Sequence, residues 1–103
     1  MCNFNTLSKN EFGLVVWCQD CESYNLYFGN ILLTLNHQGL EQFKDYIMQK
    51  YSASYCNGNR ECKQILVETT LDGMQMFFSL NEMGALIALI QEAEINHFQD
   101  LLV

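Results

Sequence analysis

The sequence contains no proline, no low-complexity segment and few cationic residues. Because no proline-rich linker divides the 103 residues, they have room for one hydrophobic core, and we expect a single domain over residues 1–103. Five Lys and Arg stand against twelve Asp and Glu, which gives a formal net charge of −7. This charge would repel a phosphate backbone, so we expect neither nucleic acid nor a membrane as a partner.

The sequence also lacks long apolar runs and an export signal. No apolar run approaches the about 20 residues that a membrane-spanning helix needs. The first ten residues, M-C-N-F-N-T-L-S-K-N, have neither the basic nor the apolar region of a signal peptide. The five cysteines are an odd number, which fits reduced thiols in the cytosol better than a disulfide framework. These absences predict a cytoplasmic protein.

Alternating apolar residues indicate one strand, then a hairpin, then a helix. The strands are expected at residues 12–17, 24–28 and 31–35. Gly29-Asn30 supplies the two-residue turn between the second and third strands. Asn36 is a good N-cap for a helix whose apolar spacing continues to about residue 52.

The same pattern recurs in the second half of the chain. Two more strands are expected, at residues 65–69 and 74–80, around an Asp72-Gly73 turn, and Asn81 is expected to cap a second helix. The segment L-T-L-N-H-Q-G-L at 33–40 aligns with F-S-L-N-E-M-G-A at 78–85. This alignment predicts a duplication, and chance similarity at a common type of junction is the alternative.

These patterns predict an α+β fold of tandem ββα units. We expect one extra N-terminal strand, about five strands in a mostly antiparallel sheet, and two helices packed on it. The two halves would cover about residues 22–52 and 63–95. Residues 1–10 are expected to be flexible, and a slip in the apolar spacing predicts a kink or a separate C-terminal segment at 96–103.

With both helices on one face of the sheet, the other face would remain apolar. The face under the helices would carry Leu26, Phe28, Leu33, Ile65, Met76 and Phe78. The opposite face would carry Trp17, Tyr27, Leu32, Leu66 and Phe77. Because burying each of these side chains is worth roughly 1.5–3 kcal/mol, we expect a sheet-to-sheet homodimer, with a returning terminal segment as the alternative cover.

The one recognisable chemical motif is C-Q-D-C, with thiols at Cys18 and Cys21. The directions of the strands and helices bring His37 and His97 to the same end of the sheet, whereas the other three cysteines fall at the opposite end. Cys18, Cys21 and His37, with His97 as a further candidate ligand, could therefore hold a structural zinc ion. The alternative is a solvated His37, a frayed tail around His97 and no cofactor.

Catalytic signatures are missing from the sequence. It has no Gly-rich phosphate loop and no G-x-S-x-G turn. Asp20 and Glu22 beside the C-x-x-C disfavour the thiolate that a thiol–disulfide enzyme needs, so that activity is the least favoured. The helical carboxylates Glu41, Asp45, Glu92 and Glu94 are expected on solvated faces. We therefore expect a small non-catalytic domain that binds itself or another protein, with a structural zinc domain as the alternative.

Three short features resemble a known family. They are the C-x-x-C, the F-G-N hairpin at residues 28–30, and the L-N strand–helix junctions at 35–36 and 80–81. Over roughly residues 17–93 the chain resembles a family of small uncharacterised proteins from Bacteroidota, although Gly39 and Gly84 stand where a capping-box Glu is expected. The resemblance implies a bacterial source and no known activity.

Overall fold

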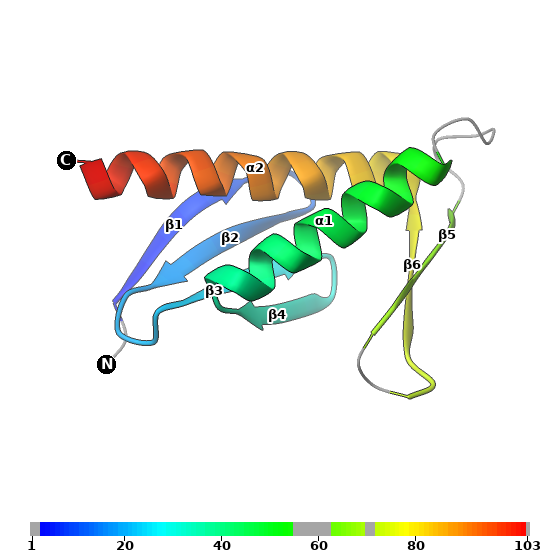
Figure 1. The fold of residues 1–103 in the computed structure, drawn as a ribbon, viewed down its shortest axis with the longest axis horizontal. Coiled ribbons are helices and arrows are strands. Elements are labelled where there is room, and N and C mark those ends of the chain that lie inside the picture. The colour runs from blue at the N-terminus through cyan, green and yellow to red at the C-terminus, as the bar shows by residue number, and fades with distance from the viewer. Residues whose placement is uncertain (1–2, 55–62, 70–71, 103) are drawn as a thin grey trace.

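The computed structural model describes residues 3–54, 63–69 and 72–102. In chain order the elements are β1 (Phe4–Lys9), β2 (Gly13–Cys18), β3 (Ser23–Phe28), β4 (Ile31–Leu35), α1 (His37–Ser54), β5 (Lys63–Glu68), β6 (Gln75–Ser79) and α2 (Leu80–Leu102). α2 runs along the length of the molecule beside the four-stranded sheet, and α1 crosses in front of that sheet (Figure 1). The β5–β6 hairpin lies beside the C-terminal end of α1 and the N-terminal end of α2 (Figure 1).

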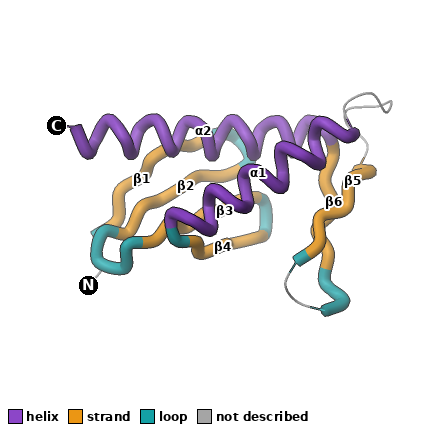
Figure 2. The backbone as a smooth tube through the Cα atoms, in the orientation of Figure 1, coloured by secondary structure: helices purple, strands orange, loops and turns teal. Residues whose placement is uncertain are grey.

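The α+β class predicted from the sequence is confirmed, but the strands form two sheets where one of about five strands was expected. β1, β2, β3 and β4 form an antiparallel sheet in that order, and β5 pairs antiparallel with β6 in a separate hairpin. Figure 2 shows the reason: α1 carries the chain away from β4 to the other end of the molecule before β5 begins. Among the described strands, β4 therefore has β3 as its one neighbour and ends the sheet with an open edge.

Phe4–Lys9 form strand β1, which corrects the expectation of flexibility for this part of residues 1–10. β1 pairs antiparallel with β2, and the register shifts at a bulge between Thr6 and Ser8. The bulge lets two consecutive residues, Leu7 and Ser8, both be buried, so the simple alternation that identifies a strand is lost. The Ser8 hydroxyl donates to the Leu89 carbonyl at 2.7 Å, which ties β1 to α2.

The two helices begin with different N-caps. The predicted cap of α1 is confirmed, because Oδ1 of Asn36 accepts a hydrogen bond from the Gly39 amide at 2.7 Å. The expected cap Asn81 is wrong, since α2 already begins at Leu80. Ser79 and Glu82 form a reciprocal capping box there, with N–H···O distances of 3.1 and 2.8 Å.

α2 continues without interruption to Leu102, so the predicted break before residue 96 does not occur. The buried stripe of α2 ends at Ala93 and is continued by the half-buried polar residues Asn96 and His97. Ile95 and Phe98 project outward, with 58% and 63% of their surface exposed. Among the described residues, neither helix combines the length and apolar character that crossing a membrane requires.

The core lies between the strands and the two helices. Five of the six predicted helix-facing residues are buried there, and Leu33 packs against them half-buried. Four residues of the predicted opposite face are exposed, namely Tyr27, Leu32, Leu66 and Phe77. Trp17 was assigned to the wrong face. It pairs across the strands with the buried Tyr24 and packs against the core, because it shares the parity of Val15 along β2.

Candidate functional site

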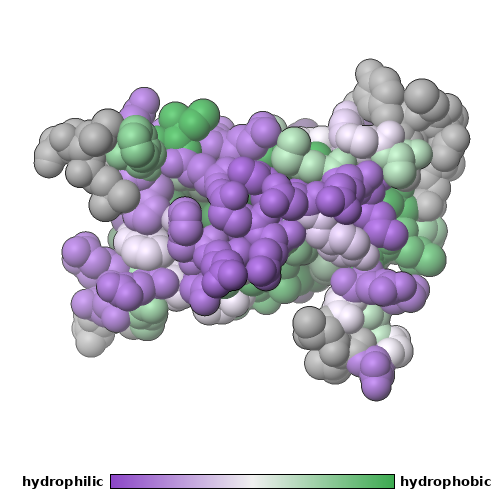
Figure 3. Space-filling view, in the orientation of Figure 1, coloured by the Kyte–Doolittle hydropathy of each residue, from purple (hydrophilic) through white to green (hydrophobic). Residues whose placement is uncertain are grey.

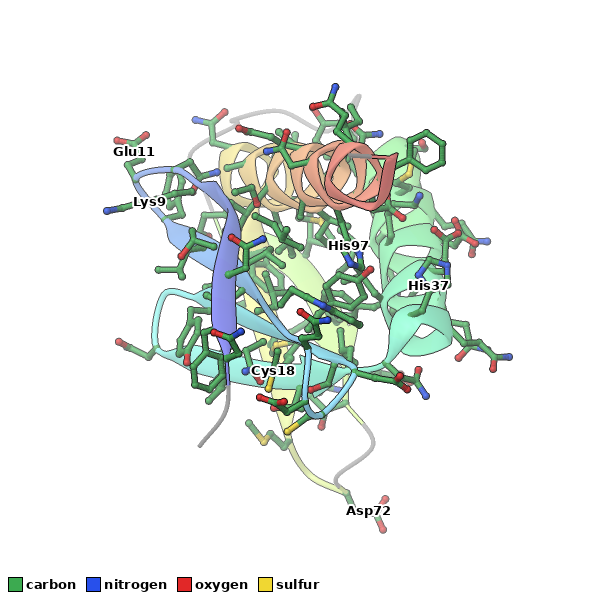
Figure 4. The ribbon with its side chains drawn as sticks, turned by 90° about the vertical axis from the view of Figure 1, so that its left-hand side faces the viewer. Lys9, Glu11, Cys18, His37, Asp72 and His97 are labelled. Carbon is green, nitrogen blue, oxygen red and sulfur yellow. The ribbon has the colours of Figure 1, made fainter. Side chains whose placement is uncertain are left out.

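An open groove of about 820 Å³ lies where the start of β1, the β2–β3 hairpin, the start of α1 and the last turns of α2 converge. Its lining residues are Asn3, Phe4, Asn5, Trp17, Gln19, Glu22, Asn36, His37, Gln38 and His97. His37 and His97 therefore come together with residues of the C-Q-D-C hairpin, as the strand directions predict. In Figure 4, His97 points from α2 toward the sheet, and His37 lies on α1 beside it.

Two of the lining residues, Trp17 and His97, form a cluster of three rings with the buried Tyr24 behind them. The indole of Trp17 lies 4.4 Å from the His97 ring and 4.8 Å from the Tyr24 ring, measured between centroids. The Tyr24 hydroxyl and Nδ1 of His97 are hydrogen-bonded at 2.7 Å. This cluster joins β2, β3 and α2, and it explains why the C-terminal turns of α2 stay on the sheet although their buried stripe has become polar.

The electrostatics of the cluster keep Tyr24 protonated. Burial raises the pKa of Tyr24, and the neighbouring carboxylates Glu94 and Glu41 raise it further because they repel a phenolate. The protonated Tyr24 hydroxyl can donate to Nδ1 of His97 or accept from it, and the tautomer of the imidazole decides which.

Glu41 and Glu94 form a polar bridge between α1 and α2. The Glu41 side chain is 44% exposed, as expected of a solvated face, whereas Glu94 is 21% exposed and departs from that expectation. Nζ of Lys44 lies 2.9 Å from Glu94 and 3.5 Å from Glu41. Burial, and then a hydrogen bond with Glu41, raise the pKa of Glu94. That hydrogen bond, together with Lys44, lowers the pKa of Glu41. The two carboxyls thus differ in proton affinity although they share one lysine.

The two cysteines of the motif do not join the histidines in the groove lining. Cys18 is buried at the end of β2, and Cys21 is exposed on the hairpin. Because strand side chains alternate, Cys18 lies on the opposite face of β2 from Trp17. Within residues 3–54, 63–69 and 72–102, no group of three or more His, Cys, Asp or Glu could hold a metal ion.

The zinc hypothesis for Cys18, Cys21, His37 and His97 stays a prediction. Cys2, Cys56 and Cys62, which were expected at the opposite end of the sheet, lie outside the described residues. Metal analysis of tag-free protein tests it directly. One zinc per chain that is lost in Cys18→Ser would support the site, and sub-stoichiometric zinc that the substitution leaves unchanged would contradict it.

The groove residues that the motif-based interpretation missed are the five Asn and Gln residues and Trp17, which packs on the buried Tyr24. Asn and Gln carry no catalytic or metal-binding signature, so their gathering from three separate segments cannot be read from spacing. Trp17 and Tyr24 could have been found from their cross-strand register, had the parity of β2 been assigned from Val15.

A second surface is the face of the four-stranded sheet that neither helix covers, which we call the outer face. It carries the exposed side chains of Phe4, Leu32 and Tyr27, which are 60%, 52% and 40% exposed. A shallow hollow of about 270 Å³ on it is lined by Phe4, Thr6, Leu14, Val16 and Tyr27. The β5–β6 hairpin exposes a smaller apolar pair, Leu66 and Phe77, which lie directly opposite each other. Figure 3 shows apolar side chains at the edge of the molecule beside this hairpin and polar ones over the outer surface of α1.

Comparison with protein-family models matches residues 1–103 to the Family of unknown function (DUF6686). The chain belongs to this family. Comparison with curated proteins gave no match, and comparison with solved structures gave none. Membership of DUF6686 accordingly brings no activity with it, and a function for this chain has to be argued from its two surfaces.

Proposed function

We propose that this DUF6686 domain is a non-catalytic interaction module that pairs with a second copy through the outer face. The observation that carries the proposal is the exposure of large apolar side chains on a sheet face that neither helix covers. Monomeric soluble proteins rarely keep such a contiguous patch exposed. The proposal includes a cytosolic location, because an odd number of cysteines fits reduced thiols better than a disulfide framework.

The charge pattern supports a second copy of the chain as the partner. The strand register places eleven residues on the outer face, and of these only Lys9 is charged; the others are Phe4, Thr6, Leu14, Val16, Cys18, Ser23, Asn25, Tyr27, Leu32 and Thr34. A chain with net charge −7 repels its own copies wherever charged surfaces meet. A nearly uncharged face is where two such chains can approach, and a twofold axis would pair identical patches.

The open edge of β4 adds to the same surface. Its sequence, I-L-L-T-L, has none of the charged residues or prolines that commonly protect edge strands. The opposite edge strand, β1, is instead held by α2 through Ser8 and through Asn96, whose amide donates to the Leu7 carbonyl. The β1 edge of the sheet is therefore attached to α2, whereas the β4 edge is open to pairing with another strand.

Size-exclusion chromatography with light scattering tests the proposal, using Leu32→Lys and the matched variant Ile95→Lys. Both replace a half-exposed aliphatic residue with lysine, but Ile95 lies on α2. We expect a wild-type dimer. Leu32 of each chain should contribute about 1 kcal/mol to the free energy of dimerisation. Replacing it in both chains should therefore raise the dimer Kd about thirtyfold. Ile95→Lys should leave the dimer intact. A strictly monomeric wild type, or dissociation by Ile95→Lys alone, would contradict the outer face as the interface.

A further inference from the structure

The groove beside His37 and His97 has a lining chemistry unlike the rest of the surface. Five of its ten residues carry side-chain amides, and only Glu22 is a carboxylate. Its lining, as far as the structure describes the chain, contains no Lys and no Arg. In a chain with twelve acidic and five basic residues, this makes the groove a nearly uncharged, strongly hydrogen-bonding surface. Its volume of about 820 Å³ falls within the range typical of small-molecule sites.

This lining discriminates between classes of ligand. Phosphates and carboxylates are recognised by arginine or lysine, which the groove lacks. Divalent cations need several carboxylate or imidazole ligands close together, and the described residues hold no such group. Each amide offers both donors and an acceptor, so a set of amides matches a neutral ligand that carries many hydroxyl groups.

The aromatic wall supplies the second half of such a site. A sugar ring has hydroxyl groups at its rim and an apolar C–H face, and an indole offers a flat apolar surface of matching size. Trp17 is held in place by its contacts with Tyr24 and His97, so little ordering is needed when a ligand arrives. We infer that the groove binds the ring of a neutral sugar, with Trp17 against its C–H face and the amides of Gln19 and Gln38 on its hydroxyls.

The fold sets the backbone positions of the amide residues before any ligand binds. The backbone N–H of Asn3 donates to the Asp20 carboxylate at 2.7 Å, and the backbone N–H of Gln19 donates to the backbone carbonyl of Asn3 at 3.3 Å, which fixes the start of β1 against the hairpin. Oδ1 of Asn36 is used as the cap of α1, so its NH₂ group is the part left for a ligand. The side-chain amides of Gln19 and Gln38 make no hydrogen bond within the described part of the chain.

Tryptophan fluorescence tests the inference, because Trp17 is the one tryptophan of the chain. D-Glucose, D-galactose and N-acetyl-D-glucosamine are titrated into the full chain, with glucose 6-phosphate and adenosine as comparison ligands. We expect a saturable change in Trp17 emission with at least one neutral sugar and weaker binding of the phosphorylated one. Gln38→Ala should weaken that binding about three- to tenfold, as for a lost neutral hydrogen bond, and Gln19→Ala similarly.

Gln42→Ala is the matched control, since Gln42 is exposed one helical turn after Gln38 and is not among the lining residues. It should bind like the wild type, and circular dichroism should show all three variants folded. The inference is overturned if no neutral sugar gives a saturable change, or if the Gln19→Ala/Gln38→Ala double variant binds as well as wild type. A response to adenosine alone would also overturn it, because a nucleobase would then be the ligand.

Discussion

The two faces of the four-stranded sheet are made by alternate residues of the same strands, yet one face is closed and the other open. Val15, Tyr24 and Leu26 on the helix side are almost fully buried, whereas Tyr27 and Leu32, their neighbours along β3 and β4, are about half exposed. Large apolar side chains stand on both faces, but on the outer face they are mixed with polar residues such as Thr6, Ser23 and Asn25. The position of the two helices decides which of the large apolar side chains are buried. The outer face keeps exposed apolar side chains because α1 and α2 both pack on the other face of the sheet.

Gly13→Ala should have the largest effect on stability, because it disturbs the pairing of β2 with β3, which both faces of the sheet share. A Cβ at Gly13 would lie 1.9 Å from the backbone oxygen of Tyr27, so β2 and β3 would have to separate. We expect a loss of more than about 3 kcal/mol in the free energy of unfolding, measured in urea. Gly84→Ala is the control: its Cβ meets Tyr51 at an ordinary 3.6 Å, and alanine favours the helix. Equal effects of the two substitutions would contradict the tight β2–β3 approach.

Leu26→Ala and Leu32→Ala compare the two faces directly. Leu26 is 1% exposed and Leu32 is 52% exposed, on neighbouring strands. Truncating Leu26 should cost about 2–5 kcal/mol, and truncating Leu32 less than about 1 kcal/mol, in urea unfolding at a protein concentration low enough to hold the chain monomeric. Similar losses at both positions would mean that something covers the outer face within a single chain.

Tyr24→Phe and Tyr27→Phe sharpen the comparison at the level of one hydroxyl. Tyr24 loses its hydrogen bond to His97, which should cost about 1 kcal/mol and change the emission of Trp17 beside it. Tyr27 lies on the outer face, 40% exposed, so its substitution should change stability by less than about 0.5 kcal/mol. A Tyr24→Phe protein with wild-type stability and emission would show that the ring cluster does not hold α2.

Glu94→Gln should have the smallest effect, visible as a pH dependence. Because the folded-state pKa of Glu94 is raised, ionising it costs stability, and this cost appears as the pH rises above its ordinary value of 4.5. The stability of Glu94→Gln relative to wild type should therefore increase from pH 4 to pH 7, by less than about 1 kcal/mol because Glu94 is partly solvated. The difference in melting temperature between the two proteins measures it. A difference that shrinks with pH would reverse the assignment of the raised pKa.

The sequence predicted the elements better than their partners. Alternation located β2, β3 and β4, and Asn36 marked the start of α1, because strand period and capping are local properties. The separation of the β5–β6 hairpin was missed because periodicity carries no information on which strands pair. β1 was missed because its bulge buries Leu7 and Ser8 in succession, and the cap of α2 was misplaced although S-L-N-E at 79–82 is a capping-box pattern.

The candidate groove was predictable in position and not in composition. Strand direction was enough to bring His37, His97 and the C-Q-D-C hairpin to one end of the molecule. The face on which Trp17 and Cys18 lie depends on strand parity, and an error of one residue exchanges the two faces. Chain direction grouped the histidines with Cys18 without regard to the face that its side chain occupies, whereas the structure groups them with Trp17 and the amides.

Sedimentation equilibrium of the wild type, Leu32→Lys and Leu66→Lys tests most directly which apolar surface joins two chains. Pairing through the outer face predicts a wild-type mass of twice the 12.0 kDa of one chain, the same mass for Leu66→Lys on the β5–β6 hairpin, and dissociation toward a single chain for Leu32→Lys. A wild type with the mass of one chain at every concentration, or a dimer that Leu66→Lys disrupts and Leu32→Lys does not, would contradict it.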